Sequence, residues 1–282
     1  TFLITLLISE GERFNMITTL TITNNAMDSI YKKITYLIKP NLPEYRVVSY
    51  NNIDVMQIIY NYRNKKIPWK KISHLINDNN GFVLCREDIN IPPSVGIKRY
   101  SSDLLTKQMC KNAAIKYIKV NNYDPKKLKI LIFDKDAKYI DILEDIIMLT
   151  NDIRIVTDFP KLYYKKANQL RDDYGASIVV SDNLTNFESC ADILISPDKI
   201  IKKLNLKNSA VVFTSKKPSV NLNAKVYYSY KVKLPKKVMN IIPADLEPEY
   251  FLSALYDNYK IYSLSSIVPS YCISDESVVS IL

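Results

Sequence analysis

The stretch Lys129-Ile-Leu-Ile-Phe-Asp134 opens the part of the chain that decides the fold. A helical pattern follows at Ala137–Leu149, and two further strand-like runs, Ile153–Asp158 and Ser177–Ser181, flank the amphipathic stretch Lys161–Tyr174. A fourth run of the same kind comes next. Short strands that alternate with helical segments of about a dozen residues are typical of a parallel sheet with crossover helices. The sequence therefore predicts an α/β fold in this half of the chain.

The turn after the first strand departs from the usual dinucleotide-binding turn of such a Rossmann-like sheet. In that turn, Gly-x-Gly-x-x-Gly lets the backbone approach a pyrophosphate at the start of a helix. Here the three glycine positions fall on Asp134, Asp136 and Tyr139. We expect two carboxylates to face the phosphates, which disfavours NAD(P). Asp158, at the end of the second strand, keeps the place of the ribose-binding acid.

Several short motifs extend this comparison to a family. They are Lys129–Asp134, Thr157-Asp158, the Ala167–Leu170 helix before Tyr174-Gly175-Ala176, and Ala191-Asp-Ile-Leu-Ile-Ser196. Together they resemble the nucleotide-binding domain of the shikimate dehydrogenase and glutamyl-tRNA reductase group, over roughly residues 126–215. The resemblance implies a Rossmann-like domain that binds NADP or NAD in that group. It places the nucleotide site at Asp134, Asp136, Asp158 and Ser196. Because the glycine-rich loop is missing, we carry over the fold and not the cofactor.

A second resemblance is to the receiver domain of response regulators, in which acids after the first strand hold Mg²⁺. It would make Asp134 and Asp136 the metal ligands and Asp182 the phosphoacceptor. The spacing is longer than that domain requires, and Asp192–Ser196 would be an extra strand. We therefore expect no metal.

The composition is that of a globular protein with room for two domains. The chain has 282 residues, of which 47% are hydrophobic and 24% charged, and it carries a formal net charge of +10. Lys, Ile, Asn and Tyr are abundant, as AT-rich coding DNA would give, which suggests a low-GC bacterium. Some of the positive charge then reflects base composition and not a partner.

The first residues resemble a translated upstream region. Thr1–Ile8 is apolar but far shorter than the roughly 20 residues that span a bilayer. Glu10-Gly-Glu-Arg13 is what a purine-rich ribosome-binding site would encode, and Met16 follows closely. We hypothesise that residues 1–15 are a mis-called upstream segment. No later run is apolar enough for a membrane, and the scattered cysteines fit reduced thiols, so we expect a cytoplasmic protein without a membrane partner.

The chain is expected to divide into an N-terminal α/β domain at 16–122, a linker at 123–128, and a Rossmann-like domain with a C-terminal helix at 129–282. The predicted N-terminal strands are Ile17–Thr23, Tyr45–Tyr50 and Gly81–Cys85, and the predicted helices are Ala26–Ile38, Asp54–Asn64 and Leu104–Val120. After the fourth strand we expect a helix at Lys199–Leu204, strands at Ala210–Thr214 and Lys225–Tyr230, and a helix at Glu249–Tyr259. The family resemblance implies that this last helix returns to the N-terminal domain, and a homodimer surface is the alternative.

Two basic stretches of the N-terminal half are candidate binding surfaces. Basic residues among aromatics suit nucleic acid, and the members here are Arg63, Lys65, Lys66, Trp69, Lys70 and Lys71. The alternative is a solvated helix end whose Trp69 and Ile72 pack inward. The loop Gly96–Tyr100 is a second anion-binding candidate through Lys98 and Arg99. Cys85 would be a nucleophile if the neighbouring Arg86 lowered its pKa, or simply a buried apolar residue.

Three functions follow as hypotheses. The first is a non-catalytic or regulatory two-domain Rossmann-like protein that binds an unknown small molecule or a protein partner in the interdomain cleft. The second is an NAD(P)-dependent oxidoreductase with an atypical phosphate loop, and the third is a nucleic-acid-associated protein that acts through residues 60–71. The sequence identifies no catalytic residue for any of them.

Overall fold

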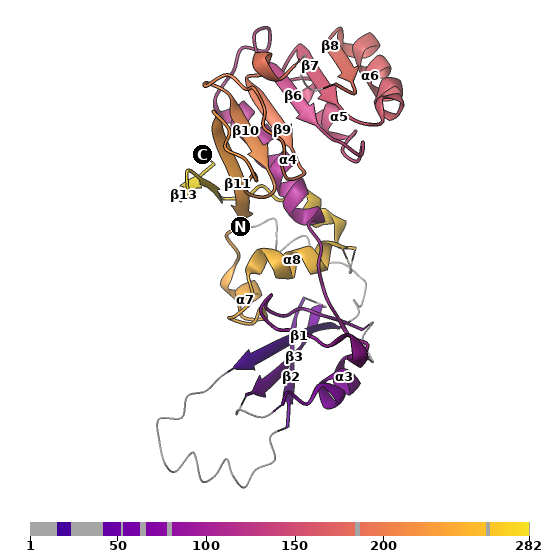
Figure 1. Ribbon diagram of the computed structural model, residues 1–282, viewed down its shortest axis with the longest axis vertical. Helices are drawn as coiled ribbons and strands as arrows, with labels where there is room; N and C mark the ends of the chain where they lie inside the picture. The colour runs from indigo at the N-terminus through magenta and orange to yellow at the C-terminus, as the bar shows by residue number, and fades with distance from the viewer. Residues whose placement is uncertain are drawn as a thin grey trace. The chain divides into compact units, whose positions relative to one another are not determined.

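The computed structural model describes residues 16–23, 42–51, 53–62, 66–77, 81–183, 187–257 and 260–281. The proposed upstream segment 1–15 and the helix predicted at 26–38 lie outside these residues. The chain forms two compact units, 1–102 with 234–264 and 103–233 with 265–282 (Figure 1). Among the described residues, no helix combines the length and the apolar character that crossing a bilayer requires.

The first unit is built on a three-stranded sheet in the order β1-β3-β2. Strand β3 is central, parallel to β1 and antiparallel to β2. A parallel pair, β4-β5, lies beside it through a bridge between Thr19 and Leu84. The elements are β1 (Ile17–Thr23), β2 (Glu44–Tyr50), β3 (Ile53–Asn61), α3 (Trp69–Asn77), β4 (Phe82–Val83), β5 (Lys98–Arg99), α7 (Lys236–Met239) and α8 (Pro248–Asp257).

The helix predicted at Asp54–Asn64 is wrong, because this segment forms strand β3. The strand buries apolar side chains on both of its faces, among them Val55, Met56 and Ile58. A strand that is buried on both faces shows no alternation, so a short apolar run of this kind cannot be told from a helix by its spacing. Pairing with β1 on one side and β2 on the other decides the outcome.

The second unit is an eight-stranded sheet in the order β13-β12-β11-β10-β9-β6-β7-β8. Strands β6 to β11 are parallel, and the hairpin β12-β13 is added antiparallel to β11. The strands are β6 (Lys129–Phe133), β7 (Asp152–Val156), β8 (Ser177–Ser181), β9 (Ile193–Ser196), β10 (Val211–Thr214), β11 (Lys225–Lys231), β12 (Tyr271–Ser274) and β13 (Ser277–Ser280). The helices are α4 (Leu104–Val120), α5 (Ile142–Ile146) and α6 (Pro160–Tyr174).

The order of the parallel strands identifies the architecture. Counted from β6 as the first strand, the sequence β8-β7-β6-β9-β10-β11 reads 3-2-1-4-5-6, which is the order of the doubly wound dinucleotide-binding fold. Helix α6 packs against β8, and α4 packs against β9, β10 and β11 (Figure 1). The predicted α/β fold class, with a C-terminal Rossmann-like sheet preceded by a smaller α/β domain, is confirmed.

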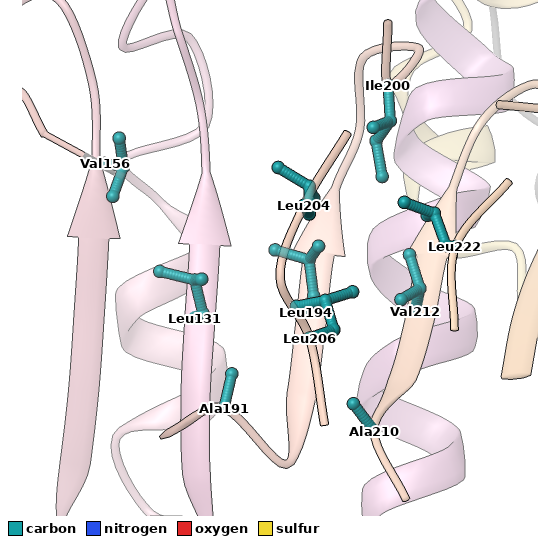
Figure 2. Close-up of a cluster of buried hydrophobic side chains, with 10 residues drawn as sticks. All are labelled: Leu131, Val156, Ala191, Leu194, Ile200, Leu204, Leu206, Ala210, Val212 and Leu222. Atoms are coloured by element: carbon teal, nitrogen blue, oxygen red, sulfur yellow. The ribbon is translucent and has the colours of Figure 1, made fainter. Parts of the chain in front are cut away.

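Packing in the core of the second unit explains why the helix predicted at Lys199–Leu204 is a loop in the structure. Residues 199–204, expected to be helical, have no regular secondary structure. Ile200, Leu204 and Leu206 from this loop are buried and pack in one cluster with Leu194 of β9 and Val212 of β10 (Figure 2). The backbone amide of Asn205 donates to the Glu188 carboxylate at 2.8 Å. An extended path places three apolar side chains on the sheet within a short segment, which outweighs the local helical preference.

The division into units differs from the predicted domains. Helix α4, assigned to the N-terminal domain in the sequence, belongs to the second unit, and the boundary falls at 102 and 103, before the predicted linker. Residues 234–264, with helix α8, belong to the first unit. The hairpin β12-β13 was not foreseen, and it makes β11 an interior strand of the sheet.

Candidate functional site

The strand order of the second unit marks one place for a ligand. Strands β7 and β8 are added to the sheet on one side of β6, and strands β9, β10 and β11 are added on its other side. In an open parallel sheet, ligands bind outside the carboxyl ends of the strands at this switch point. The residues that follow β6 and β9, from Asp134 and from Pro197, therefore form the candidate site.

Asp134, the first residue after β6, has no exposed surface. Its carboxylate accepts hydrogen bonds from the backbone amides of Lys138 at 3.0 Å and Tyr139 at 2.7 Å. The hydroxyl of Tyr163, in α6, donates to the same carboxylate at 2.6 Å. Loop amides at the start of a helix are the donors that a bound phosphate would use. The loop thus binds a carboxylate of its own chain, which differs from the expectation that Asp134 would face a ligand.

The rest of the loop is shaped around this carboxylate. Ala137 is buried and has φ of 51°, in the left-handed region where glycine is the usual residue. The helix predicted at Ala137–Leu149 shrinks to α5, Ile142–Ile146, because the turn that holds Asp134 uses the residues before it. An α-helix this short aligns few peptide dipoles toward its N-terminus. The first crossover helix therefore contributes a weaker dipole to this loop than a full-length helix would.

Asp136 occupies the second glycine position and is exposed. Its carboxylate forms an ion pair with Lys138 Nζ at 2.6 Å. The hydrogen bond from Lys138 and the charge of that residue lower the pKa of Asp136. Both groups are open to solvent, so this pair neutralises charge on the surface of the loop.

Tyr139 occupies the third glycine position, where the fold normally needs close helix packing. The residue is 8% exposed, and its hydroxyl is buried without a hydrogen-bond partner among the described residues. Burial raises the pKa of Tyr139, and the nearby carboxylates of Asp198 and Asp134 raise it further. Lys111 Nζ lies 5.8 Å from the centre of its ring. The space that a glycine would leave open is filled by a neutral phenol.

The turn after β9 is also closed by internal contacts. Ser196 is buried, and its hydroxyl donates to the Asp198 carbonyl at 3.0 Å, while Thr214 Oγ1 donates to the same carbonyl at 2.9 Å. Lys107 Nζ, from α4, lies 2.6 Å from Asp198 Oδ1 and 3.2 Å from Asp103 Oδ2. Burial opposes the charge of Lys107, but the hydrogen bonds and charges of Asp198 and Asp103 raise its pKa overall.

Asp158, like Asp136, is a predicted nucleotide-site residue that stays open to solvent. It follows β7 and is exposed, and its nearest cation is Lys135 Nζ at 3.8 Å. Its backbone amide donates to the Lys135 carbonyl at 2.9 Å, which ties it to the loop that holds Asp134. A ribose hydroxyl could reach this carboxylate without displacing a strong internal contact.

Sequence reasoning missed the residues that close the site. Tyr163, Lys107 and Asp198 come from three different elements, and their contacts depend on the sheet order. Asp198 lies two residues after the Ala191–Ser196 motif, so its position in the sequence could have placed it next to the site. Tyr163 carried none, since a tyrosine on the buried face of an amphipathic helix is ordinarily core.

The basic stretch of the first unit is only partly described. Arg63 and Lys65 lie outside the described residues. Lys66, Lys70 and Lys71 are exposed, whereas Trp69 packs against a core cluster that contains Ile72. Trp69 and Ile72 thus pack inward, as the alternative of a solvated helix end describes.

Cys85 and the two basic residues of β5 belong to the first unit. Burial raises the pKa of the Cys85 thiol, and Arg99, not Arg86, is the cation that partly opposes this rise. Arg86 is engaged with Asp88 in an ion pair. A buried thiol with a raised pKa is a poor nucleophile. Lys98 is exposed and Arg99 is half-buried.

The part of the chain that the structure describes contains no group of three or more His, Cys, Asp or Glu residues that could hold a metal ion. Asp134 and Asp136, which the receiver-domain resemblance would assign to Mg²⁺, point to different partners. Asp134 is buried on backbone amides, and Asp136 is exposed beside Lys138.

Comparisons with known proteins give similar structures but no family. No family model matches the sequence, and no curated protein matches it. L-Tryptophan dehydrogenase from Nostoc punctiforme is 14% identical, with a TM-score of 0.37 over 89% of this chain and 79% of that chain. A putative D-3-phosphoglycerate dehydrogenase from Ralstonia solanacearum is 9% identical, with a TM-score of 0.40 over 89% and 92%. A shikimate dehydrogenase in complex with NADP⁺ is 10% identical, with a TM-score of 0.31 over 90% and 97%. At this similarity we assign the fold from the strand order of the chain itself.

Proposed function

We propose that this chain is a non-catalytic or regulatory Rossmann-like protein, which binds a small molecule or a protein partner instead of turning over a dinucleotide. The observation that carries the proposal is the seat of the Asp134 carboxylate on the amides of Lys138 and Tyr139. A phosphate brought to the same donors would have to displace a buried carboxylate and would meet its charge. The favourable interaction of loop amides with an anion is already made within the chain.

The remaining polar groups of the site support the same conclusion. Ser196 and Thr214 are bound to the Asp198 carbonyl, and the Asp198 carboxylate is bound to Lys107. The Tyr139 ring fills the position where a dinucleotide-binding loop has its third glycine. A ligand would have to break several of these contacts, and each replacement would only exchange one hydrogen bond for another.

A thermal-shift titration with NAD, NADH, NADP and NADPH tests the proposal. A ligand at a hundredfold excess over its Kd stabilises a protein by about 2.7 kcal/mol, which a melting curve detects. We expect no saturable shift with any of the four. A saturable shift with one dinucleotide, abolished by Asp158→Ala and retained by the matched surface variant Asp136→Ala, would overturn the proposal.

The second candidate is an oxidoreductase with an atypical phosphate loop. It is favoured by one observation, the solvent-exposed Asp158 at the end of β7, in the place of the acid that binds ribose. Under this hypothesis the cofactor would contact Asp158 and leave the Asp134 loop untouched. The Asp158→Ala arm of the titration separates this candidate from the first.

The third candidate, a nucleic-acid-associated protein, is supported by the exposed Lys66, Lys70 and Lys71 on and before α3. Phosphate contacts release counterions, so binding through these lysines would weaken steeply as salt rises. Titration of a short DNA duplex at two salt concentrations is the test. Affinity that does not change with salt would count against this candidate.

A further inference from the structure

The first unit contains a cavity of about 430 Å³ that the Rossmann-like sheet does not use. Its lining residues are Asn90, Ile91, Pro93, Gly96, Ile97, Lys98 and Arg99. The volume lies within the range of about 300–1,000 Å³ that small-molecule sites occupy. The cavity therefore has room for a small ligand.

The charge of the lining is one-sided. Lys98 and Arg99 are both cations, and the lining includes no carboxylate. Within the described ranges, neither cation has an acidic partner within 4 Å. Asp103, the nearest acid along the chain, pairs with Lys107, and Asp88 pairs with Arg86. The lining thus carries two positive charges that have no ion-pair partner among the described residues.

Arg99 is held in place and yet under-bonded. One of its terminal nitrogens donates to the Ile89 carbonyl, and its guanidinium lies against the Cys85 thiol. Its Nε is buried and has no hydrogen-bond partner among the described residues. Burying part of a guanidinium without a carboxylate partner costs free energy. A bound anion or a water molecule that accepts a hydrogen bond from it would lower this cost.

The loop that carries the cavity is fixed by local structure. Gly96 ends the short 3₁₀ turn Pro93–Val95 with φ of 74°, a conformation that glycine adopts without strain. The Lys98 amide then donates to the Gly81 carbonyl at 2.9 Å, and Ile97 packs into the core. The cations are therefore presented from an anchored strand.

We propose that this cavity binds a small organic carboxylate with a short apolar tail, its negative charge facing Arg99 and Lys98. Ile91, Pro93 and Ile97 supply the apolar part of the lining, which suits a short branched hydrocarbon. That this carboxylate is the small molecule which the protein binds in place of a dinucleotide rests on the proposed function. The binding event itself does not depend on it, because Arg99 and Lys98 lie in the first unit.

Isothermal titration with isovalerate is the test, next to acetate, inorganic phosphate and the neutral alcohol 3-methyl-1-butanol. We expect saturable binding of isovalerate, about fourfold weaker binding for each buried methylene that acetate lacks, and little binding of the alcohol. Arg99→Gln should weaken isovalerate binding at least about tenfold, since it removes a charge-assisted hydrogen bond. The matched control Arg86→Gln, outside the cavity, should bind as the wild type does.

Arg99→Lys and Lys98→Gln keep the test decisive if Arg99→Gln fails to fold. Lys98 is exposed, so its loss should leave the fold intact and still weaken binding. Equal isovalerate affinity in the wild type, Arg99→Lys and Lys98→Gln would overturn the proposal, as would no saturable binding. A response to phosphate without one to isovalerate would overturn the assignment to a carboxylate. Isovalerate binding beside a dinucleotide response lost in Asp158→Ala would overturn only the proposed function.

Discussion

Replacing Asp134 with alanine would leave three buried donors without an acceptor. They are the amides of Lys138 and Tyr139 and the hydroxyl of Tyr163, at 3.0, 2.7 and 2.6 Å from the carboxylate. An unsatisfied buried donor costs about 1–3 kcal/mol. At about 1 to 1.5 kcal/mol each, Asp134→Ala should lower the free energy of unfolding by about 3 to 4.5 kcal/mol.

Urea denaturation at neutral pH measures this loss, and two further variants sharpen it. Tyr163→Phe removes one donor together with its bond and should cost about 1 kcal/mol. In the double variant Asp134→Ala, Tyr163→Phe, the Tyr163 donor is absent. The sum of the losses measured for the two single variants should therefore exceed the loss measured for the double variant by about 1 kcal/mol. Asp136→Ala, on the exposed side of the same loop, is the control and should leave the unfolding midpoint unchanged. A loss below about 1 kcal/mol for Asp134→Ala would refute the role assigned to its carboxylate.

Three other predictions follow from the described contacts. Ala137→Gly should stabilise the protein by about 0.5 kcal/mol, because relief of the left-handed φ of 51° outweighs the added chain entropy; a lower melting temperature would contradict this. Lys107→Met should cost about 1 kcal/mol at neutral pH after solvent screening of its partly exposed partners. Since the pKa of Lys107 is raised in the folded state, its contribution is complete below about pH 10 and is lost as the pH rises through the folded-state value, so the two melting curves should converge at high pH. Alkylation of the native protein near about pH 8 should modify the half-buried Cys190 first, because burial raises the pKa of Cys110 to about 12 and that of Cys272 to about 11; equal modification of Cys110 in the folded state would contradict the buried environment.

The sequence predicted the sheet of the second unit well, and for a physical reason. Strands such as Ile193–Ser196 are short apolar runs bounded by polar residues, and each crossover is long enough to require a parallel neighbour. The same reasoning failed for Ile53–Asn61, where a strand buried on both faces carries no alternation. It also failed for residues 199–204, where packing of Ile200 and Leu204 on the sheet overrides local preference.

The sequence predicted a candidate site after the strand Lys129–Asp134, but it did not predict that the Asp134 carboxylate turns onto its own loop. The sequence shows Asp134, Asp136 and Tyr139 at the three glycine positions. From this we predicted that two exposed carboxylates would repel a phosphate. The direction in which Asp134 points depends on Tyr163, which lies in another element. No spacing rule connects these residues, because the contact exists only once α6 has packed on the sheet.

The three substitutions in the loop are physically linked. A side chain at the first glycine position can be accommodated if it turns onto the amides of Lys138 and Tyr139, and that turn places Ala137 at positive φ. The same turn shortens the helix to Ile142–Ile146 and puts the Tyr139 ring where close packing against a glycine would otherwise occur. Restoring glycine at position 134 alone would leave the ring in place and Tyr163 without its acceptor. The loop is thus held by an internal anion, the Asp134 carboxylate, on the amides that a phosphate would otherwise contact.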